Sequence, residues 1–450
     1  MNRFTLLVSL AILSLLTSCS YKETPSPKLV QSPKSKSLAQ PNIIFVVADD
    51  MGWRDTGYSG NPVVKTPQLD KMASSGLRFE QFYSAHATCA PGRMAILTGR
   101  TSLRVRMFRT VGPMKAGEAT VGQALKTAGY ETAHFGKWGL GRWSTHPLNS
   151  GFDEAIWAKG HSNNGASFYK GFSNQSDYRS NATDKNPIKT TGGSSVATMD
   201  LALDFIRKRT KRNQPFFTQV CFGSPHAPHR AHEDFKKLYS GLPEPDQNYY
   251  GEASGLDAAV GNLRRELRHL NIENNTIIWF VSDNGGIREG SGGRLKGQIG
   301  VRTLGLLEWP GNISKPTRTD IPVSHLDMYP TILDIVGLRM KGQPVVDGIS
   351  LLPLFEGRME QRSKPMGFTK GGGKVECKLG DAVWIDGSLK LRLTAARKSK
   401  PEHITLHDIY TDPSESKDLA AVHPDKVQEM LKELAVWRES VAASYLGMDY

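Results

Sequence analysis

Four short apolar runs divide the first two thirds of the chain, and each ends in polar residues. A continuous apolar run with β-branched side chains is typical of a strand buried on both faces of a sheet. The runs are residues 43–47, 130–135, 216–222 and 275–282. Segments with helical periodicity stand between them at residues 68–75, 120–128, 196–209 and 250–270. This alternation predicts an α/β fold in which a large, mostly parallel sheet is sandwiched by helices.

The pattern changes after about residue 355. A run of three glycines, residues 371–373, is followed by short alternating segments and then by an amphipathic segment that predicts a helix near residues 426–445. The alternating segments predict strands at residues 374–378, 382–385, 388–394 and 403–410. We therefore expect a main domain over residues 41–355. A smaller C-terminal subdomain, an antiparallel sheet with a helix, is expected over residues 356–450.

The first nineteen residues have the composition of an export signal. Arg3 is followed by an apolar run at residues 4–16, which is too short to span a bilayer and is typical of a signal peptide. Residues 16–19, LTSC, resemble a bacterial lipobox, so Cys19 is the expected lipid-carrying residue after cleavage. The alternative is an ordinary signal peptide that ends near a cysteine. We predict an exported lipoprotein of the cell envelope, at the outer membrane or facing the periplasm in a Gram-negative cell.

Residues 20–40 are rich in serine, proline and lysine and carry no apolar period. A segment of this composition does not build a packed core, so it is predicted to be a disordered tether. The tether would hold the folded part away from the membrane. The lipid anchor is the only expected contact with that membrane.

The overall composition is that of a globular protein. Of 450 residues, 38% are hydrophobic and 22% charged, which excludes an intrinsically disordered chain and a multi-span membrane protein. Four cysteines are too few for a disulfide scaffold. The net charge of +13 favours polyanionic partners. No dense stripe of Lys and Arg with interleaved aromatic residues occurs in the folded part, so no nucleic-acid role is expected.

Oxygen-bearing side chains directly follow two of the predicted strands. Asp49 and Asp50 come after the first strand, and Asp283 and Asn284 come after the last. In parallel sheets, ligands bind beyond the carboxyl ends of the strands, where these side chains meet. Carboxylate and amide oxygens suit Ca²⁺ or Mg²⁺ and argue against zinc, but they do not by themselves separate the two ions.

A cysteine motif lies between the first two helical segments. Residues 86–100 read HATCAPGRMAILTGR, in which Cys89, Pro91 and Arg93 form a C-x-P-x-R pattern. Pro91 suits the first turn of a helix, so Cys89 is expected at a positive helix end, where a thiolate is stabilised. The motif resembles the signature of the type I, formylglycine-dependent sulfatases of the alkaline phosphatase-like superfamily. Other matching segments, from residue 41 nearly to the end, are NIIFVVADDMGW, KTPQLDKMASSGLRF, GKWGLG, SPHAPH, VSDNGG, LEWPG, HLDMYPTILDIVG, DGISLLPL and LHDIYTDPSESKDLA.

The resemblance implies a modified nucleophile. Cys89 is expected to be converted to formylglycine (3-oxoalanine) by a formylglycine-generating enzyme and to join the metal ligands, with calcium the favoured ion. A thiol suits this chemistry poorly, because its sulfated product has no easy exit. A hydrated aldehyde carries two hydroxyls, of which one attacks sulfur while the other later loses its proton and expels sulfate. A metal ion and cationic side chains help because the substrate is anionic.

The same resemblance implies roles for three further residues. Arg93 lies four residues after Cys89, on the same helix face, and would hold the formylglycine. Lys137, in the GKW element, would contact the sulfate. His226, the first histidine of SPHAPH, would also contact the sulfate and would protonate the leaving alcohol.

Two departures from the family pattern affect the predicted site. Many members read GKWHLG, but this chain has Gly139 in place of the histidine. His161 is the candidate replacement, with an ordinary loop histidine as the alternative. Residues 293–305 read GRLKGQIGVRTLG, where a lysine and then an EGGxRVP segment are usual. Lys296 is the nearest match for the sulfate-binding lysine, with Arg294 as a substitute.

Three functions agree with these features. The leading one is a sulfatase that hydrolyses sulfate esters of a sulfated carbohydrate outside the cytoplasm. The second is a phosphodiesterase or phosphonate monoester hydrolase of the same superfamily, which can share the formylglycine motif. The third is a degenerate lipoprotein that binds sulfated glycan without turning it over, which Gly139 and the altered loop suggest.

Overall fold

The computed structural model describes residues 28–31, 40–107, 118–140, 146–158, 168–172, 193–286, 302–372, 378–396 and 401–449. The expected signal peptide with Cys19 lies outside these residues, as do His161, Arg294 and Lys296. Their predicted roles therefore stay predictions.

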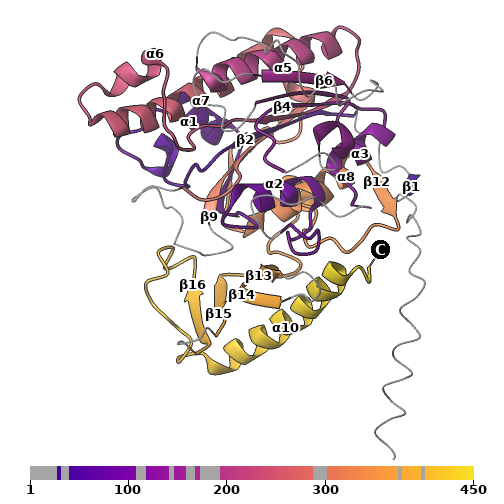
Figure 1. The fold of residues 1–450 in the computed structure, drawn as a ribbon, viewed down its shortest axis with the longest axis vertical. Coiled ribbons are helices and arrows are strands. Elements are labelled where there is room, and N and C mark those ends of the chain that lie inside the picture. Colours follow the sequence, from indigo (N-terminus) through magenta and orange to yellow (C-terminus); the bar gives the residue numbers. More distant parts are fainter. Residues whose placement is uncertain are drawn as a thin grey trace, which may run out of the picture.

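A ten-stranded sheet forms the centre of the main domain (Figure 1). Its strands follow the order β10, β3, β9, β8, β2, β7, β4, β5, β6, with β11 beside β3. Their bounds are β2 Asn42–Ala48, β3 Leu77–Tyr83, β4 Glu131–Gly136, β5 Glu154–Ala158, β6 Phe168–Phe172, β7 Phe216–Cys221, β8 Thr276–Ser282, β9 Arg302–Glu308, β10 Thr317–Thr319 and β11 Val323–Ser324. Strands β8, β2, β7, β4 and β5 are parallel, whereas β9 is antiparallel to both β8 and β3 and β6 is antiparallel to β5. The mostly parallel sheet predicted from the sequence is confirmed.

Helices cover both faces of this sheet (Figure 1). In β2, Ile43 and Phe45 belong to the core that α2, α3 and α8 cover, whereas Ile44 and Val46 belong to the core under α1, α5 and α7. This explains why the strand reads as a continuous apolar run. The helices are α1 Pro67–Ser75, α2 Cys89–Thr98, α3 Val121–Thr127, α5 Ser194–Thr210, α6 Glu233–Lys236, α7 Glu244–His269, α8 Met328–Ile335, α9 Leu352–Phe355 and α10 Pro424–Leu446. No helix in the described part of the chain is long and apolar enough to cross a membrane.

The C-terminal subdomain is the predicted antiparallel sheet with a helix. The strands β13 Met366–Gly372, β14 Lys378–Asp386, β15 Leu389–Thr394 and β16 His403–Asp408 pair in chain order. The helix α10 packs on one face of this sheet through Met430 and Leu434. Phe368 on β13 contributes to a different core, which it shares with Tyr83 and Ala95 of the main domain. The subdomain therefore packs directly against β3 and α2.

One local expectation is corrected, and another concerns residues that lie mostly outside the described chain. A four-residue strand, β1 (Lys28–Gln31), forms within the segment predicted to be a disordered tether, and it pairs antiparallel with β12 (Leu338–Lys341). The open edge of β12 offers backbone donors and acceptors that composition does not reveal. In the small sheet, the first strand is β13 at residues 366–372, before the predicted 374–378. Residues 373–377 lie outside the described chain.

A buried ion pair joins α10 to the main domain. Asp347 accepts hydrogen bonds from Arg104 Nε at 3.0 Å and from Trp437 Nε1 of α10 at 2.9 Å. Arg104 Nη1 also donates to the Ser440 carbonyl and to the Ser444 hydroxyl of α10. Burial alone would raise the pKa of Asp347, but Arg104, together with hydrogen bonds from Thr101 and Trp437, outweighs it and lowers the pKa. This carboxylate therefore holds three separate segments together.

We predict that Asp347→Ala lowers the free energy of unfolding by about 3–5 kcal/mol, because it leaves the Arg104 guanidinium buried without its counter-ion. Urea denaturation measures the change. The matched control is Glu439→Ala, which removes an exposed carboxylate from α10 itself and should change stability by less than about 0.5 kcal/mol. Equal stability of the two variants would show that the ion pair does not hold the subdomain.

Candidate active site

The predicted metal ligands meet at the carboxyl edge of the sheet. β2 and β8 are adjacent and parallel, with Ala48 level with Ser282, so the two residues that follow each strand also lie level. The amide of Asp50 donates to Asp283 Oδ1 at 3.2 Å, and Asn284 Nδ2 donates to Asp50 Oδ1 at 2.5 Å. Asp49, Asp50, Asp283 and Asn284 are all buried.

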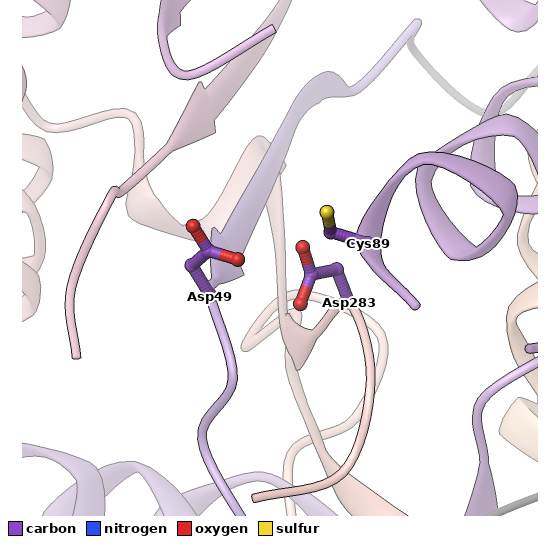
Figure 2. A group of neighbouring side chains, drawn as sticks. All are labelled: Asp49, Cys89 and Asp283. Atoms are coloured by element: carbon purple, nitrogen blue, oxygen red, sulfur yellow. The ribbon is translucent and has the colours of Figure 1, made fainter. Parts of the chain in front are cut away.

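Cys89 reaches the same point from a different element. It is the first residue of α2, and Figure 2 shows its side chain beside that of Asp283, with Asp49 on the far side of Asp283. One ligand atom from each of these three residues lies within 4.8 Å of the other two. Three segments far apart in the sequence thus present a thiol and two carboxylates to one small volume.

Close backbone contact makes this approach possible. A Cβ added to Gly92 in α2 would lie 2.1 Å from the Asp283 carbonyl oxygen, far inside van der Waals contact. A glycine is therefore required at the second variable position of the C-x-P-x-R pattern in this chain. It lets α2 rest directly on the chain that carries Asp283.

Two buried cations balance part of the negative charge. Arg93 Nε donates to Asp283 Oδ2 at 2.8 Å, and its Nη2 lies 3.8 Å from Asp49 Oδ1. Lys137, which follows β4, forms a buried ion pair with Asp49 Oδ2, and its carbonyl accepts a hydrogen bond from Arg93. Arg93 and Lys137 thus both contact the predicted metal ligands. The roles that the resemblance implies for them, holding the formylglycine and contacting the sulfate, stay predictions.

The pKa values reflect this incomplete balance. Burial raises the pKa of Asp49 well above its usual range, and the charge of Asp283 raises it further against the opposing effect of Lys137 and Arg93. For Asp283, burial acts in the same direction, but Arg93 and Lys137 outweigh it and lower the pKa. Three carboxylates face only two cations in the described part of the site, so one more positive charge would be favourable.

A divalent cation fits this donor set. Asp49 Oδ1 and Asn284 Oδ1 are buried and accept no hydrogen bond within the described chain. Buried oxygens without donors are costly, and a hard cation would satisfy both. The four oxygen-bearing residues suit Ca²⁺ or Mg²⁺ better than zinc.

The thiol of Cys89 differs from the sequence-based expectation. Its place at the helix start is confirmed, but its pKa is raised and not lowered. Burial is the main cause, and the negative charge of Asp283 adds to it, whereas Lys137 and Arg93 act in the opposite direction. The unmodified side chain therefore stays a thiol at neutral pH and is a poor nucleophile.

His226 lies at the rim of the site. Its Nε2 is 3.6 Å from Asp50 Oδ2, and its Nδ1 lies 2.5 Å from the Ala227 carbonyl. Burial and the positive charge of Lys137 lower its pKa, so the ring is neutral at pH 7. About a fifth of the side chain remains exposed (22%), so it can meet both solvent and a ligand.

Gly139 faces the charged cluster, where the family usually places a histidine. Its φ of +71° is in the left-handed region. A Cβ at this position would lie 3.6 Å from Lys137 Cε and 3.7 Å from Arg93 Cδ, which is ordinary contact. The position is thus part of the site, and its side chain is missing in this chain. His161, the predicted replacement, lies outside the described residues.

Sequence reasoning missed a supporting layer beneath the ligands. His325 is fully buried, its Nε2 lies 2.9 Å from the Ser282 carbonyl, and its Nδ1 accepts from the Ala85 amide. The Ser282 hydroxyl accepts from the amide of Met51. These contacts fix the ends of β8 and β2 next to the ligands. The sequence offered one sign of this role, a histidine at the start of the apolar segment 325–337. A histidine in that position is equally compatible with an ordinary core residue.

Comparison with known proteins bears on the chemistry. A family model described as Sulfatase matches residues 41–338. The chain belongs to the sulfatase family. Human N-acetylgalactosamine-6-sulfatase is 33% identical over 376 residues, which span 76% of this chain and 70% of that protein. This sulfatase therefore shares the family's enzymatic class, the sulfuric ester hydrolases.

Solved structures agree with the fold. Ps i-CgsB in complex with k-i-k-neocarrahexaose superposes with a TM-score of 0.76 and 25% identity, covering 89% of this sulfatase and 93% of that chain. Phosphonate monoester hydrolase of Agrobacterium radiobacter has a TM-score of 0.63 at 20% identity, covering 89% and 96% of the two chains. At that identity, the second likeness concerns the fold alone.

We predict that Gly92→Ala lowers stability by about 1–3 kcal/mol, because the new methyl group forces α2 away from the Asp283 backbone. Cys89 and Arg93 move with the helix, so sulfatase activity should fall about a hundredfold. Thermal unfolding and a sulfate-release assay measure the two effects. Gly241→Ala is the control, because that glycine has no heavy atom within 4 Å of the added Cβ. Full activity of Gly92→Ala would contradict the close-contact argument.

Proposed function

We propose that this protein is a formylglycine-dependent, divalent-metal-dependent sulfatase that hydrolyses sulfate esters of a sulfated carbohydrate. The observation that carries the proposal is the meeting of Cys89 with Asp49 and Asp283 within 4.8 Å. The raised pKa of the thiol supports it too, because an unmodified Cys89 would be unreactive in this setting.

Each described residue has a physical task in this proposal. Asp49, Asp50, Asp283 and Asn284 would hold the metal ion, which would polarise a sulfate oxygen, and formylglycine at position 89 would supply the attacking hydroxyl. Arg93 holds the start of α2 and the ligand Asp283 in fixed positions through its buried hydrogen bonds. Lys137, which is paired with Asp49, would offer a cationic group to the sulfate. His226 is neutral without substrate, so it would first take up a proton beside the anionic sulfate ester and then give that proton to the leaving alcohol.

Calcium is the proposed ion, with magnesium as the alternative. Calcium accepts more oxygen ligands in more flexible arrangements than magnesium, which keeps several waters and demands octahedral geometry. A set of four protein side chains together with the group at position 89 supports the larger ion.

A glycan substrate is supported by the relatives. One is named N-acetylgalactosamine-6-sulfatase, and one solved structure holds a neocarrahexaose. The net charge of +13 would attract a polyanionic chain, although charge of this kind also serves solubility. Export as a lipoprotein, through the signal at residues 1–19, and maturation by a formylglycine-generating enzyme complete the proposal.

We expect wild-type protein from its native host to release sulfate from an aryl sulfate faster than it cleaves an aryl phosphodiester. Cys89→Ala should lose this activity to the background rate, because it lacks the precursor of the aldehyde. Mass spectrometry of the tryptic peptide Phe79–Arg93 reports directly whether Cys89 has become formylglycine.

The other outcomes point to the alternative functions. Faster cleavage of the diester would identify a phosphodiesterase or phosphonate monoester hydrolase. An unmodified Cys89 in folded, exported protein, with sulfated-glycan binding that persists in Cys89→Ala, would identify a degenerate binding protein.

Removal of the metal should lower the melting temperature by several degrees, because an ion that binds only the folded state at about a hundred times its Kd adds about 2.7 kcal/mol of stability. Calcium should restore the transition at a lower concentration than magnesium. Asp49→Asn should abolish the ion-dependent shift, whereas Asp234→Asn, which alters an exposed carboxylate on α6, should keep it. An unchanged shift in Asp49→Asn would exclude this metal site.

A further inference from the structure

Two arginines lie on a tryptophan beside the metal ligands and take no part in the proposed reaction. The guanidinium carbon of Arg302 lies 4.0 Å from the centre of the Trp53 ring, and that of Arg54 lies 4.8 Å from it. Arg54 is exposed, whereas only 15% of the Arg302 side chain is accessible. We call Trp53, Arg54 and Arg302 the arginine–tryptophan cluster.

Positive charge exceeds negative charge around this cluster. Glu80 pairs with Arg78 at 2.5 Å and with Arg318 at 3.0 Å, so its oxygens are engaged by other residues. Arg302 reaches it only at 3.9 Å, and the buried Nε of Arg302 makes no hydrogen bond within the described chain. In the same part of the chain, Arg54 forms no ion pair at all. Among the described residues, three guanidinium groups therefore share the Glu80 carboxylate, and Arg54 adds a fourth positive charge that is not paired with an acid.

The cluster lies at the same edge of the sheet as the candidate active site. β8 and β9 are antiparallel with Val281 level with Gly305, and the continued register places Arg302 level with Asn284. A hydrogen bond from Thr303 Oγ1 to the Asn284 carbonyl at 3.2 Å confirms this closeness. Arg54 lies four positions after Asp50 in the chain, so their Cα atoms are at most about 14 Å apart.

The cluster also lies on one defined side of the metal ligands. In the sheet order, β9 flanks β8 on the side away from β7 and β4. Those two strands carry the elements with His226 and Lys137, which serve the sulfate that reacts. Cationic groups thus stand on both sides of the metal ligands. Among the described residues on the side of β9, none has a task in the proposed reaction, and Lys296, the predicted sulfate-binding lysine before β9, lies outside them.

We infer that Arg54 and Arg302, held against Trp53, form a subsite that binds a second acidic group, a sulfate or a carboxylate, of the same glycan chain. This inference rests on the proposed function, since the reacting sulfate lies at Cys89. A guanidinium binds such oxyanions through two parallel hydrogen bonds, and the indole ring orients it beforehand. The substrate class is then a glycan with several anionic groups, and the spacing of these groups contributes to recognition.

Binding to catalytically inert protein tests the subsite without requiring turnover. In the Cys89→Ala background, calorimetry measures the affinity for a chondroitin 6-sulfate hexasaccharide and for k-i-k-neocarrahexaose in low salt. Arg54→Ala should weaken binding of at least one of them about fivefold, and 1 M salt should remove the difference. The affinity of Arg54→Lys should lie between those of the parent and of Arg54→Ala, because the lysine keeps the charge but lacks the planar guanidinium group. The control is Arg212→Ala, an exposed arginine at the opposite edge of the sheet near Glu131, which should bind as the parent does.

Turnover gives the second readout. With formylglycine-bearing protein, the ratio of kcat/KM for the hexasaccharide to kcat/KM for 4-nitrophenyl sulfate should fall about fivefold in Arg54→Ala. An equal fall for both substrates overturns the inference and indicates a structural role. Unchanged affinity in Arg54→Ala, or failure of both hexasaccharides to bind the parent, also overturns it. Absence of sulfate release from wild type would count against the proposed function, and the binding comparison would still decide the subsite.

Discussion

The arrangement of the site depends on an unbalanced group of buried charges. Asp49, Asp50 and Asp283 stand against Arg93 and Lys137 in a volume that water barely reaches. Separating such charges from their partners is expensive, so the ends of β2, β4 and β8 and the start of α2 are held in one geometry. A divalent cation would change the sum from negative to positive, and a positive site would attract a sulfate ester. In the proposed function, metal binding and substrate attraction would thus both follow from one electrostatic constraint.

The same constraint supports the proposal that Cys89 acts only after modification. Burial disfavours a thiolate at Cys89, and the carboxylate of Asp283 adds to this effect. A nucleophilic hydroxyl at position 89 would have to lose a proton while it attacks, which a nearby metal ion and cationic side chains favour. The carboxylates of this site could hold such an ion, and Arg93 and Lys137 are the cations. Gly92 and the register of β2 with β8 bring the parts together to within contact distance, which leaves little freedom for either element to shift.

Around this constrained centre, two features bear on substrate recognition. Gly139 removes a side chain that would touch Lys137 and Arg93. On the other flank, Arg54 and Arg302 place unbalanced positive charge against Trp53. The charge cluster fixes the chemistry, whereas these outer positions can vary, because none of them carries the central ion pairs. Substrate choice is therefore expected to depend on them.

The sequence by itself determined the fold class, the four central strands and the identity of the metal-ligand candidates. It could do so because strands buried on both faces leave a continuous apolar run, and because Asp49 and Asp283 stand directly at the ends of such runs. Strands at the sides of the sheet, such as β3 and β9, mix polar and apolar residues and were not found. β1 pairs with an edge far away in the sequence, so local composition predicted disorder there. Only the tertiary structure decided the raised pKa of Cys89, the support from His325 and the charge surplus at Arg302, because burial and long-range charge depend on which distant segments meet.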